Sequence, residues 1–158
     1  MKNLEIERKF LVEAKEWSSL IKPEGIRYIQ GYLCIDSRKV IRIRVAADTG
    51  YLTIKGKSTN FSRPEFEYII PAAEANEMIF KFTDQIVEKV RFRIPIGAFV
   101  FEIDEFIGLN AGLVLAEIEL MSPDDEFDHP AWLGQEVTQD PRYYNSYLSK
   151  HPYSTWKK

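Results

Sequence analysis

The sequence predicts a fold of the α+β class that is mainly antiparallel β: a barrel of about eight strands with flanking helices. Much of the chain alternates polar with apolar or aromatic residues at a period of two, which is the pattern of β-strands. On six of these segments the polar positions carry two residues of like charge, and the positions between them are apolar. A barrel with a charged interior and a covered apolar exterior accounts for both observations.

Eight segments are expected to form strands. Five of them alternate clearly, and three more are rich in β-branched and aromatic residues. A hairpin turn is predicted at Asp48, Thr49 and Gly50, just before the fourth strand. In chain order, the predicted strands are residues 5–10, 29–35, 40–45, 51–55, 65–70, 89–94, 98–105 and 117–120.

Three segments favour helices: residues 14–21, 72–82 and 142–150. The second begins after Pro71, and the third follows Asp140 and Pro141, a capping residue and then a proline. We expect the apolar faces of these helices to cover the outside of the barrel. The aromatic residues expected to contribute to this cover are Trp17, Phe80, Phe82, Tyr144 and Tyr147.

Length and composition indicate one globular domain, residues 1–158, with 45% hydrophobic and 28% charged residues. Cys34 is the only cysteine, so an intramolecular disulfide is excluded, and no secretory signal pattern precedes the first strand; we expect a cytoplasmic protein. The apolar stretch 94–101 contains Pro95 and Gly97 and is too short to span a membrane. A net charge of -3 argues against a nucleic-acid partner.

Several common sites are not supported by the sequence. His129 and His151 are far from each other and from Cys34, so a zinc site of ordinary type is not expected. The stretch from Gly50 to Ser58 resembles a P-loop, but it is one residue too long and contains a predicted strand. The sequence also does not support a catalytic Ser-His-Asp set or a Cys-His pair, because no serine or cysteine has an identifiable base.

The strongest indication of function is that each of six predicted strands carries a pair of like-charged residues on one face. Side chains two positions apart on a strand point to the same face. A solvent-facing sheet is the simplest explanation for one such pair, but solvated faces usually mix the two signs. Sorting over six strands instead predicts a concave site in which carboxylates hold hard divalent cations and basic side chains hold a polyanion such as phosphate. The pairs are Glu5 and Glu7, Arg42 and Arg44, Glu65 and Glu67, Lys89 and Arg91, Glu102 and Asp104, and Glu117 and Glu119.

The segment Glu5-Ile6-Glu7-Arg8-Lys9 resembles the E-x-E-x-K motif of the CYTH, or triphosphate tunnel metalloenzyme, superfamily. The remaining charged positions of that superfamily follow in the same order: Arg42 and Arg44, Lys55, Glu65 and Glu67, Lys89 and Arg91, Asp104, and Glu117 and Glu119. The segments 30–33 and 140–145 are also similar. This resemblance implies a closed eight-stranded antiparallel tunnel, one or two Mg²⁺ or Mn²⁺ ions, and a substrate with a linear triphosphate.

The resemblance also implies roles for these residues. Metal ligation is expected from five carboxylates: Glu5, Glu7, Asp104, Glu117 and Glu119. Triphosphate binding is expected from six basic residues: Lys9, Arg42, Arg44, Lys55, Lys89 and Arg91. Lys9, Glu65 and Glu67 are the expected catalytic residues; the attacking water would be activated either by a second metal ion or by one of these two glutamates, and the sequence leaves this choice open.

The predicted activity is metal-dependent hydrolysis of inorganic tripolyphosphate. Alternatives with the same tunnel are a class IV type adenylate cyclase that converts ATP to cyclic AMP, and a thiamine or nucleoside triphosphatase. A polyphosphate-binding module without catalysis, or a sheet whose charged faces are merely solvated, would be alternatives of other classes. An exposed apolar patch beside Trp132 or Trp156 would be compatible with a homodimer.

Overall fold

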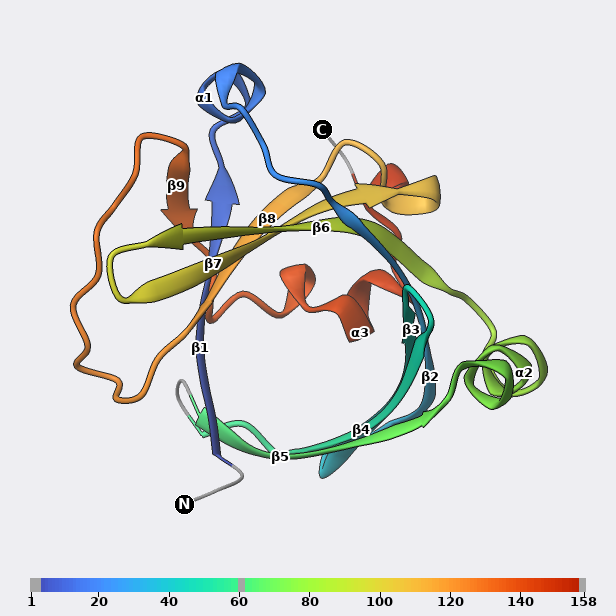
Figure 1. The fold of residues 1–158 in the computed structure, drawn as a ribbon. Coiled ribbons are helices and arrows are strands. Elements are labelled where there is room, and N and C mark those ends of the chain that lie inside the picture. Colours follow the sequence, from blue (N-terminus) through green and yellow to red (C-terminus); the bar gives the residue numbers. More distant parts are fainter. Residues whose placement is uncertain (1–3, 60–61, 157–158) are drawn as a thin grey trace.

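In a computed structural model of the chain, which describes residues 4–59 and 62–156, eight antiparallel strands close into a barrel (Figure 1). The sheet order is β5-β4-β3-β2-β6-β7-β8-β1-β9, and a further pairing between β5 and β1 closes the ring of eight. The nine strands are β1 (Leu4–Val12), β2 (Ile26–Ile35), β3 (Lys39–Ala46), β4 (Thr49–Gly56), β5 (Ser62–Pro71), β6 (Val87–Ile96), β7 (Phe99–Ile107), β8 (Val114–Glu119) and β9 (Leu133–Glu136).

All eight predicted strands are confirmed, and β9 is an additional strand that the sequence pattern did not indicate. This short strand pairs with the outer part of β1 at Phe10 and Val12. The predicted turn at residues 48–50 is one to two residues late, because Thr49 and Gly50 already belong to β4. The hairpin turns at Asp48, as predicted, and at Ala47, whose φ of 50° is unusual for a residue with a side chain.

The seam of the barrel is short. Here β1 and β5 pair in three steps, Leu4 with Pro64, Glu5 with Arg63 and Ile6 with Ser62. The same strand β1 pairs with β8 over residues 7–11. Because β1 carries the first charged motif, the seam places Glu5, Glu7 and Lys9 between the acidic residues of β8 and the charged residues of β5.

Two helices lie outside the barrel, α1 (Ala14–Ser19) and α2 (Ala72–Phe82). Ala75 and Ile79 of α2 pack against Ile43 and Val45 of β3, as the helical pattern predicted. The contact is close: a side chain at Gly50 would lie 2.7 Å from the Cβ of Ala75. None of the helices formed by the described residues has the length and apolar character needed to cross a membrane.

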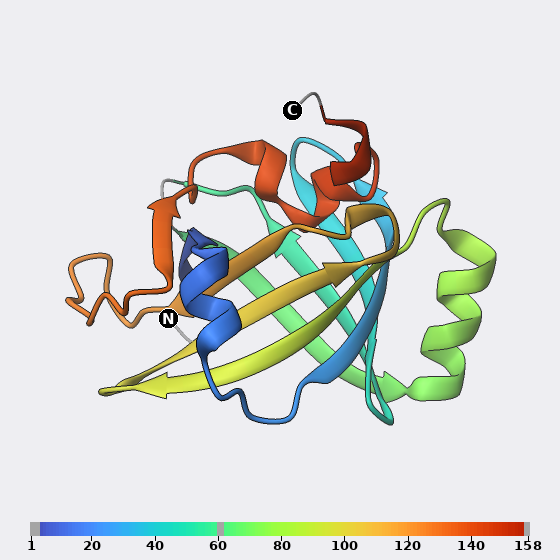
Figure 2. The ribbon, with the colours of Figure 1, turned by 90° about the horizontal axis from the view of Figure 1, so that it is seen from above.

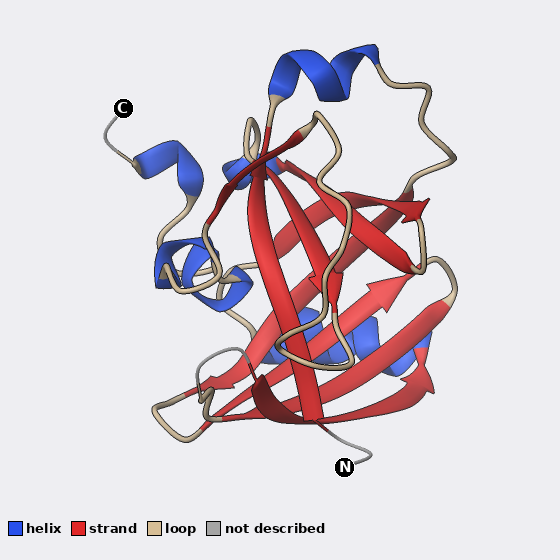
Figure 3. Cartoon of the chain, turned by 90° about the vertical axis from the view of Figure 1, so that its left-hand side faces the viewer, coloured by secondary structure: helices blue, strands red, loops and turns tan. Residues whose placement is uncertain are grey.

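The predicted cover by Phe80 and Phe82 is wrong, since these side chains are 88% and 65% exposed at the solvent face of α2. Trp17 of α1 is buried as expected, with its ring edge against Trp132 and Phe92. Over β1, β7 and β8 much of the cover comes from the irregular segment 120–132, which crosses the outer face of the barrel (Figure 3). Loops without helical periodicity are not found by a search for amphipathic helices.

The third predicted helix is interrupted and differently placed. Residues 141–143 form a 3₁₀ turn, Tyr144 is extended, and α3 (Asn145–Leu148) follows. Asp140 does cap this segment by accepting the Arg142 N–H. A further 3₁₀ turn, Tyr153–Thr155, lies near the end of the described chain, and another, Gly108–Asn110, links β7 to β8.

This C-terminal segment closes one end of the barrel rather than covering its side (Figure 2). Apolar side chains of β1, β6, β7 and β8 point inward at that end and pack against Leu148 and Val137. Tyr143, Tyr153 and Trp156 flank the same cluster. Neither tryptophan considered for a dimer contact forms an exposed patch, because Trp132 is buried and Trp156 packs on Tyr143 and Tyr153.

Replacing the residue at the centre of this plug tests its structural role. Leu148 is 0% exposed, so Leu148→Ala is expected to lower the free energy of unfolding by about 2–5 kcal/mol in urea titrations. Phe80→Ala is the matched control, because its ring is 88% exposed and the expected change is within about 0.5 kcal/mol. Equal losses in the two variants would contradict a packed plug.

Candidate active site

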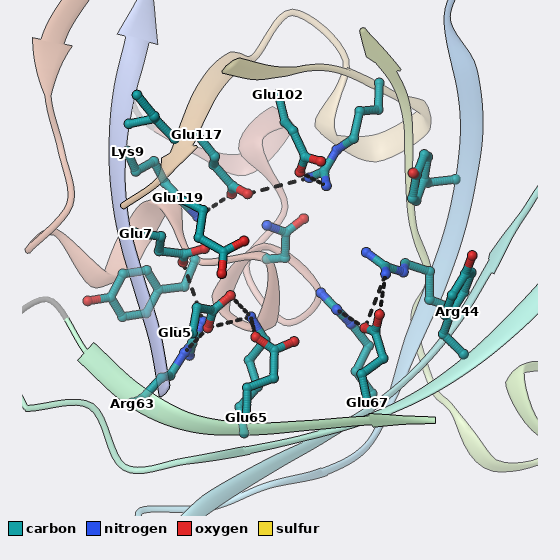
Figure 4. Close-up of a pocket in the computed structure, with 18 of the residues that line it drawn as sticks. Glu5, Glu7, Lys9, Arg44, Arg63, Glu65, Glu67, Glu102, Glu117 and Glu119 are labelled. Atoms are coloured by element: carbon teal, nitrogen blue, oxygen red, sulfur yellow. Dashed lines mark hydrogen bonds and ion pairs between the residues drawn. The ribbon is translucent and has the colours of Figure 1, made fainter. Parts of the chain in front are cut away.

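The barrel encloses a cavity of about 740 Å³ whose walls carry charged side chains (Figure 4). Of the thirteen residues predicted for the site, all but Asp104 line this cavity. They are Glu5, Glu7, Lys9, Arg42, Arg44, Lys55, Glu65, Glu67, Lys89, Arg91, Glu117 and Glu119. Tyr144, Asn145 and Ser146 of the C-terminal plug complete the lining at the closed end. Strand alternation therefore brings residues more than 110 positions apart into one site.

One wall of the cavity is acidic. Glu7 on β1 lies directly opposite Glu119 on β8 in the antiparallel register. Burial and the nearby carboxylates of Glu117 and Glu5 hold the pKa of Glu7 above its ordinary value. Burial also raises the pKa of Glu119, assisted by Glu5 and Glu102. The negative charge of this wall is thus only partly compensated by the basic side chains around it.

Such a wall fits a hard divalent cation, because carboxylate oxygens are the ligands that Mg²⁺ and Mn²⁺ prefer. A cation placed here would relieve the repulsion that raises the pKa of Glu7 and Glu119. Among the side chains of the described residues, no three carboxylate, histidine or cysteine groups already stand at metal-binding separations. Binding a cation therefore requires some of these glutamates to rotate away from their present basic partners.

The opposite wall, formed by β3, β4 and β5, is basic. Arg42 and Arg44 each bury an Nε atom that has no hydrogen-bond partner among the described residues. Burial, with the positive charges of Arg42 and Arg91 close by, lowers the pKa of Arg44. The guanidinium of Arg44 lies over the rings of Tyr28 and Tyr51, with its Cζ 5.3 and 4.8 Å from their centroids. Positive charge is in excess here, which suits a polyanion.

Glu67 and Glu65 lie on the basic side of the cavity. Glu67 accepts hydrogen bonds from Arg44 Nη2 at 3.1 Å and from Thr53 Oγ1 at 2.8 Å. Lys55 Nζ lies 2.7 Å from Glu5 Oε1 and 3.6 Å from Glu65 Oε2, so it links β4 to both walls. These two glutamates therefore face the region between the basic wall and the seam.

Lys9 is held by the floor of the cavity. Its Nζ lies 2.9 Å from Glu117 Oε1 and donates a 3.2 Å hydrogen bond to the carbonyl of Tyr143 in the plug. Burial opposes its charge, but Glu117 and Glu7 outweigh burial and hold the pKa of Lys9 above its ordinary value. Lys9 is accordingly a cation whose position depends on both β8 and the C-terminal segment.

Asp104 lies behind the cavity wall and is 0% exposed. Its carboxylate accepts from Lys89 Nζ at 2.5 Å and from Arg91 Nε and Nη2 at 2.6 and 2.7 Å. Burial opposes its ionisation, but Arg91 and Lys89 outweigh burial and lower the pKa of Asp104. Burial lowers the pKa of Lys89 to about 8, since Asp104 compensates that effect only in part. The geometry makes Asp104 a buried anchor for two basic side chains.

The lining residues that were absent from the predicted site include Tyr28, Tyr51, Arg63, Glu102 and Asn145. Glu102 ion-pairs with Arg91, and its alternation with Asp104 had already indicated the inward face. Arg63 alternates with Glu65 in the same way, but Pro64 between them obscured the start of the strand. Asn145, in the C-terminal plug, accepts a 3.2 Å hydrogen bond from Lys89 Nζ through its Oδ1 atom. No local sequence pattern predicts this contact.

The chain is similar in sequence and in fold to known triphosphatases. The sequence profile of the CYTH domain matches residues 3–150. An inorganic triphosphatase of Acetivibrio thermocellus is 49% identical over 154 residues, which cover 97% of both chains. An inorganic triphosphatase of Nitrosomonas europaea is 36% identical over 151 residues, or 92% of this chain and 96% of that protein. A crystal structure of an inorganic triphosphatase is similar with a TM-score of 0.63 and 34% identity, covering 92% of this chain and 93% of its own.

The acidic wall gives a pH test. The folded-state pKa of Glu119 is raised above its ordinary 4.5, so the protonated form is favoured by folding, and its contribution to stability is lost as pH rises through the folded-state pKa. In metal-free buffer, Glu119→Gln is therefore expected to melt at a higher temperature than the unsubstituted protein at pH 8. The two melting temperatures should converge below pH 4.5. A lower melting temperature for Glu119→Gln at pH 8 would contradict the proposed charge imbalance.

The buried anchor gives a second test. Asp104→Asn leaves Lys89 and Arg91 buried without their main counter-ion, and is expected to cost about 3–5 kcal/mol of unfolding free energy. Glu105→Gln on the outer face of the same strand is the control. Its carboxylate pairs with Lys22, and the two side chains are 34% and 25% exposed, so a loss below about 1 kcal/mol is expected. Similar losses from chemical denaturation of both variants would refute the anchor.

Proposed function

Because the chain belongs to the CYTH domain family, we propose that it is an inorganic triphosphatase that hydrolyses tripolyphosphate with Mg²⁺ or Mn²⁺ in the barrel cavity. The observation that carries the proposal is the sorting of charge between two walls whose ion pairs within the chain compensate it only in part. Glu7 and Glu119 form an acidic wall, Arg42 and Arg44 form a basic wall, and both face one enclosed space. A divalent cation bound together with a linear triphosphate would neutralise the two walls at once.

We assign the acidic wall to metal binding. Glu5, Glu7, Glu117 and Glu119 would hold the cation, since all four line the cavity and the pKa values of Glu7 and Glu119 are raised by burial and by neighbouring carboxylates. Bound Mg²⁺ or Mn²⁺ supplies charge neutralisation at phosphate oxygens and can polarise water. Asp104 was also predicted as a ligand. Its hydrogen bonds to Lys89 and Arg91 favour a positioning role instead, in which it orients these two cations toward the cavity.

We assign the triphosphate chain to the basic side chains. The six basic residues surround the cavity from four strands and would contact different phosphates along it: Lys9 on β1, Arg42 and Arg44 on β3, Lys55 on β4, and Lys89 and Arg91 on β6. Forked guanidinium groups match phosphate oxygens well, and Arg42 and Arg44 both line the cavity. Hydrolysis breaks a P–O–P bond by attack of water, and the charge that develops on phosphate oxygens would be stabilised by these donors.

The proton of the attacking water needs an acceptor. Glu67 Oε2 accepts hydrogen bonds from the Thr53 hydroxyl and from Arg44, while Glu65 Oε2 lies 3.6 Å from Lys55 Nζ. Each carboxylate lines the cavity on the side of the basic wall, near the expected path of the phosphates. We propose that one of the pair accepts the proton, and Lys9 remains charged to stabilise the leaving phosphate.

The adenylate cyclase, thiamine triphosphatase and nucleoside triphosphatase alternatives are not favoured, because both full-length relatives carry the name inorganic triphosphatase. Retention of all the charged lining positions likewise argues against a binding module without catalysis. We also propose that the protein acts in the cytoplasm, in agreement with its single cysteine, Cys34.

The activity test measures phosphate release from tripolyphosphate, ATP and thiamine triphosphate, each with Mg²⁺ or Mn²⁺, together with cyclic AMP from ATP. Metal-dependent release with preference for tripolyphosphate is expected, and chelation by EDTA should abolish it. Cyclic AMP as the main product would refute the proposal. Binding of tripolyphosphate without any release would also refute it.

Substitution of Lys9 tests the assigned site. Lys9→Ala removes a cation from the reacting phosphates and is expected to reduce kcat/KM by roughly 10²–10³-fold. Lys22→Ala is a matched control, because Lys22 forms an ion pair of the same 2.9 Å length with Glu105 on the outer face. Its kcat/KM should be unchanged. Near-normal turnover by Lys9→Ala would contradict the assignment of Lys9 to the reacting phosphates.

A further inference from the structure

Arg63 lies at the seam of the barrel, across from Glu5 in the β1–β5 register. Its Nε donates to Glu5 Oε2 at 2.9 Å, and its Nη2 lies 3.5 Å from Glu7 Oε1 (Figure 4). The guanidinium thus spans the two carboxylates that the proposed function assigns to the metal ion. Burial opposes its charge, but Glu5 and Glu7 outweigh burial and raise the pKa of Arg63, so it is a permanent cation.

The other cations near the acidic wall are held more firmly. The side chains of Lys9, Lys89 and Arg91 are 5%, 2% and 8% exposed, and each has a partner besides the metal-binding candidates of β1. Lys9 bonds to the Tyr143 carbonyl, and Lys89 and Arg91 bond to Asp104. Arg63 is 26% exposed, and both of its ion pairs among the described residues go to Glu5 and Glu7. It is therefore the cation that can leave this wall with the fewest other contacts broken.

Glu5 and Glu7 cannot serve Arg63 and a divalent cation fully at the same time. A carboxylate oxygen that coordinates a metal ion loses acceptor capacity, and a guanidinium within hydrogen-bond reach would repel the ion. The divalent cation carries the higher charge and prefers these oxygens. Arrival of the ion should consequently release the guanidinium of Arg63 from both carboxylates.

Released, the side chain stays at the cavity, because β5 fixes its backbone in the wall and Arg63 itself lines the enclosed space. Lys55 lies on the neighbouring strand β4, across from Glu65, which is two residues from Arg63 on β5. A free guanidinium there has five N–H donors and lies beside the residues assigned to the phosphate chain.

We propose that Arg63 is a further substrate-binding residue, which occupies Glu5 and Glu7 in the metal-free protein and turns to the triphosphate when a divalent cation takes those carboxylates. This inference rests on the proposed function and extends it to the order and coupling of ligand binding. The metal ion alone binds more weakly because it must displace Arg63. Metal ion and triphosphate together bind with positive coupling, since each favours the released position of this one side chain.

The first experiment uses Mn²⁺ alone. Mn²⁺ is titrated into the metal-free full-length protein, without triphosphate, and binding is followed by calorimetry and by loss of the free Mn²⁺ paramagnetic resonance signal. Arg63→Ala is expected to bind Mn²⁺ about tenfold more tightly than the unsubstituted protein, a change of about 1.4 kcal/mol. Arg63→Lys, which keeps the charge but cannot span both carboxylates, should fall between them.

The second experiment measures hydrolysis of tripolyphosphate at saturating Mn²⁺. Arg63→Ala is expected to raise KM about tenfold with a smaller change in kcat, because a contact with the phosphate chain is lost. Arg8→Ala is the control for both experiments. Arg8 projects from the opposite face of β1 and pairs with Glu136 at 2.5 Å, so its loss should change neither Mn²⁺ affinity nor KM.

Three outcomes would overturn parts of the proposal. Unchanged or weaker Mn²⁺ binding by folded Arg63→Ala, with activity of the unsubstituted protein intact, removes the competition and leaves the proposed function standing. Tighter Mn²⁺ binding with unchanged KM removes the phosphate contact. An unsubstituted protein that neither binds Mn²⁺ nor releases phosphate overturns the proposed function and this inference together. Circular dichroism checks folding, and Arg63→Gln replaces Arg63→Ala if the smaller side chain destabilises the seam.

Discussion

The structure depends on one constraint: a closed barrel that turns its ionised side chains inward must give every buried charge a partner. Moving a carboxylate or ammonium group out of water costs several kcal/mol, and only close opposite charges and hydrogen bonds offset that cost. Lys9 with Glu117, and Asp104 with Lys89 and Arg91, meet the requirement within the chain. The antiparallel register supports it, because Lys9 lies across from Glu117 and Arg91 lies across from Asp104.

An inward charged face leaves an outward apolar face, so the same alternation dictates what must lie around the barrel. Helix α2 covers Ile43 and Val45, and α1 with the segment 120–132 covers Phe101 and Ile103. At one end the inward positions change from charged to apolar, and Leu148 fills the space between them. The plug also reaches the chemistry, since Tyr143 and Asn145 accept hydrogen bonds from Lys9 and Lys89. The outer cover of the barrel, its closed end and its charged cavity therefore all follow from the alternation of charged and apolar residues along the strands.

That pattern explains what could be predicted from the sequence. Alternation is local, so the eight barrel strands and twelve of the thirteen predicted lining residues followed from it together with the family resemblance. Other features depend on contacts between distant segments. Nothing in the local sequence shows that Asp104 lies behind Lys89, that residues 133–136 pair with β1, or that α3 closes the barrel. Phe80 and Phe82 satisfied a helical pattern but face solvent, because α2 buries only its opposite side.

Some charged side chains around the cavity have all their hydrogen-bond and ion-pair partners within the chain, and others do not. This difference distinguishes structural residues from residues available to bind a ligand. Asp104 is saturated with donors on both oxygens, so it gains nothing from a ligand and holds Lys89 and Arg91 in place. Glu7 and Glu119 carry excess negative charge, whereas Arg42 and Arg44 retain unpartnered donors. A cation alone would relieve one wall and leave the other in excess, and an anion alone would do the reverse. A metal ion and a polyanion bound together would complete the pairing on both walls, and for this reason the charge distribution of the barrel supports the proposal of a metal-bound triphosphate.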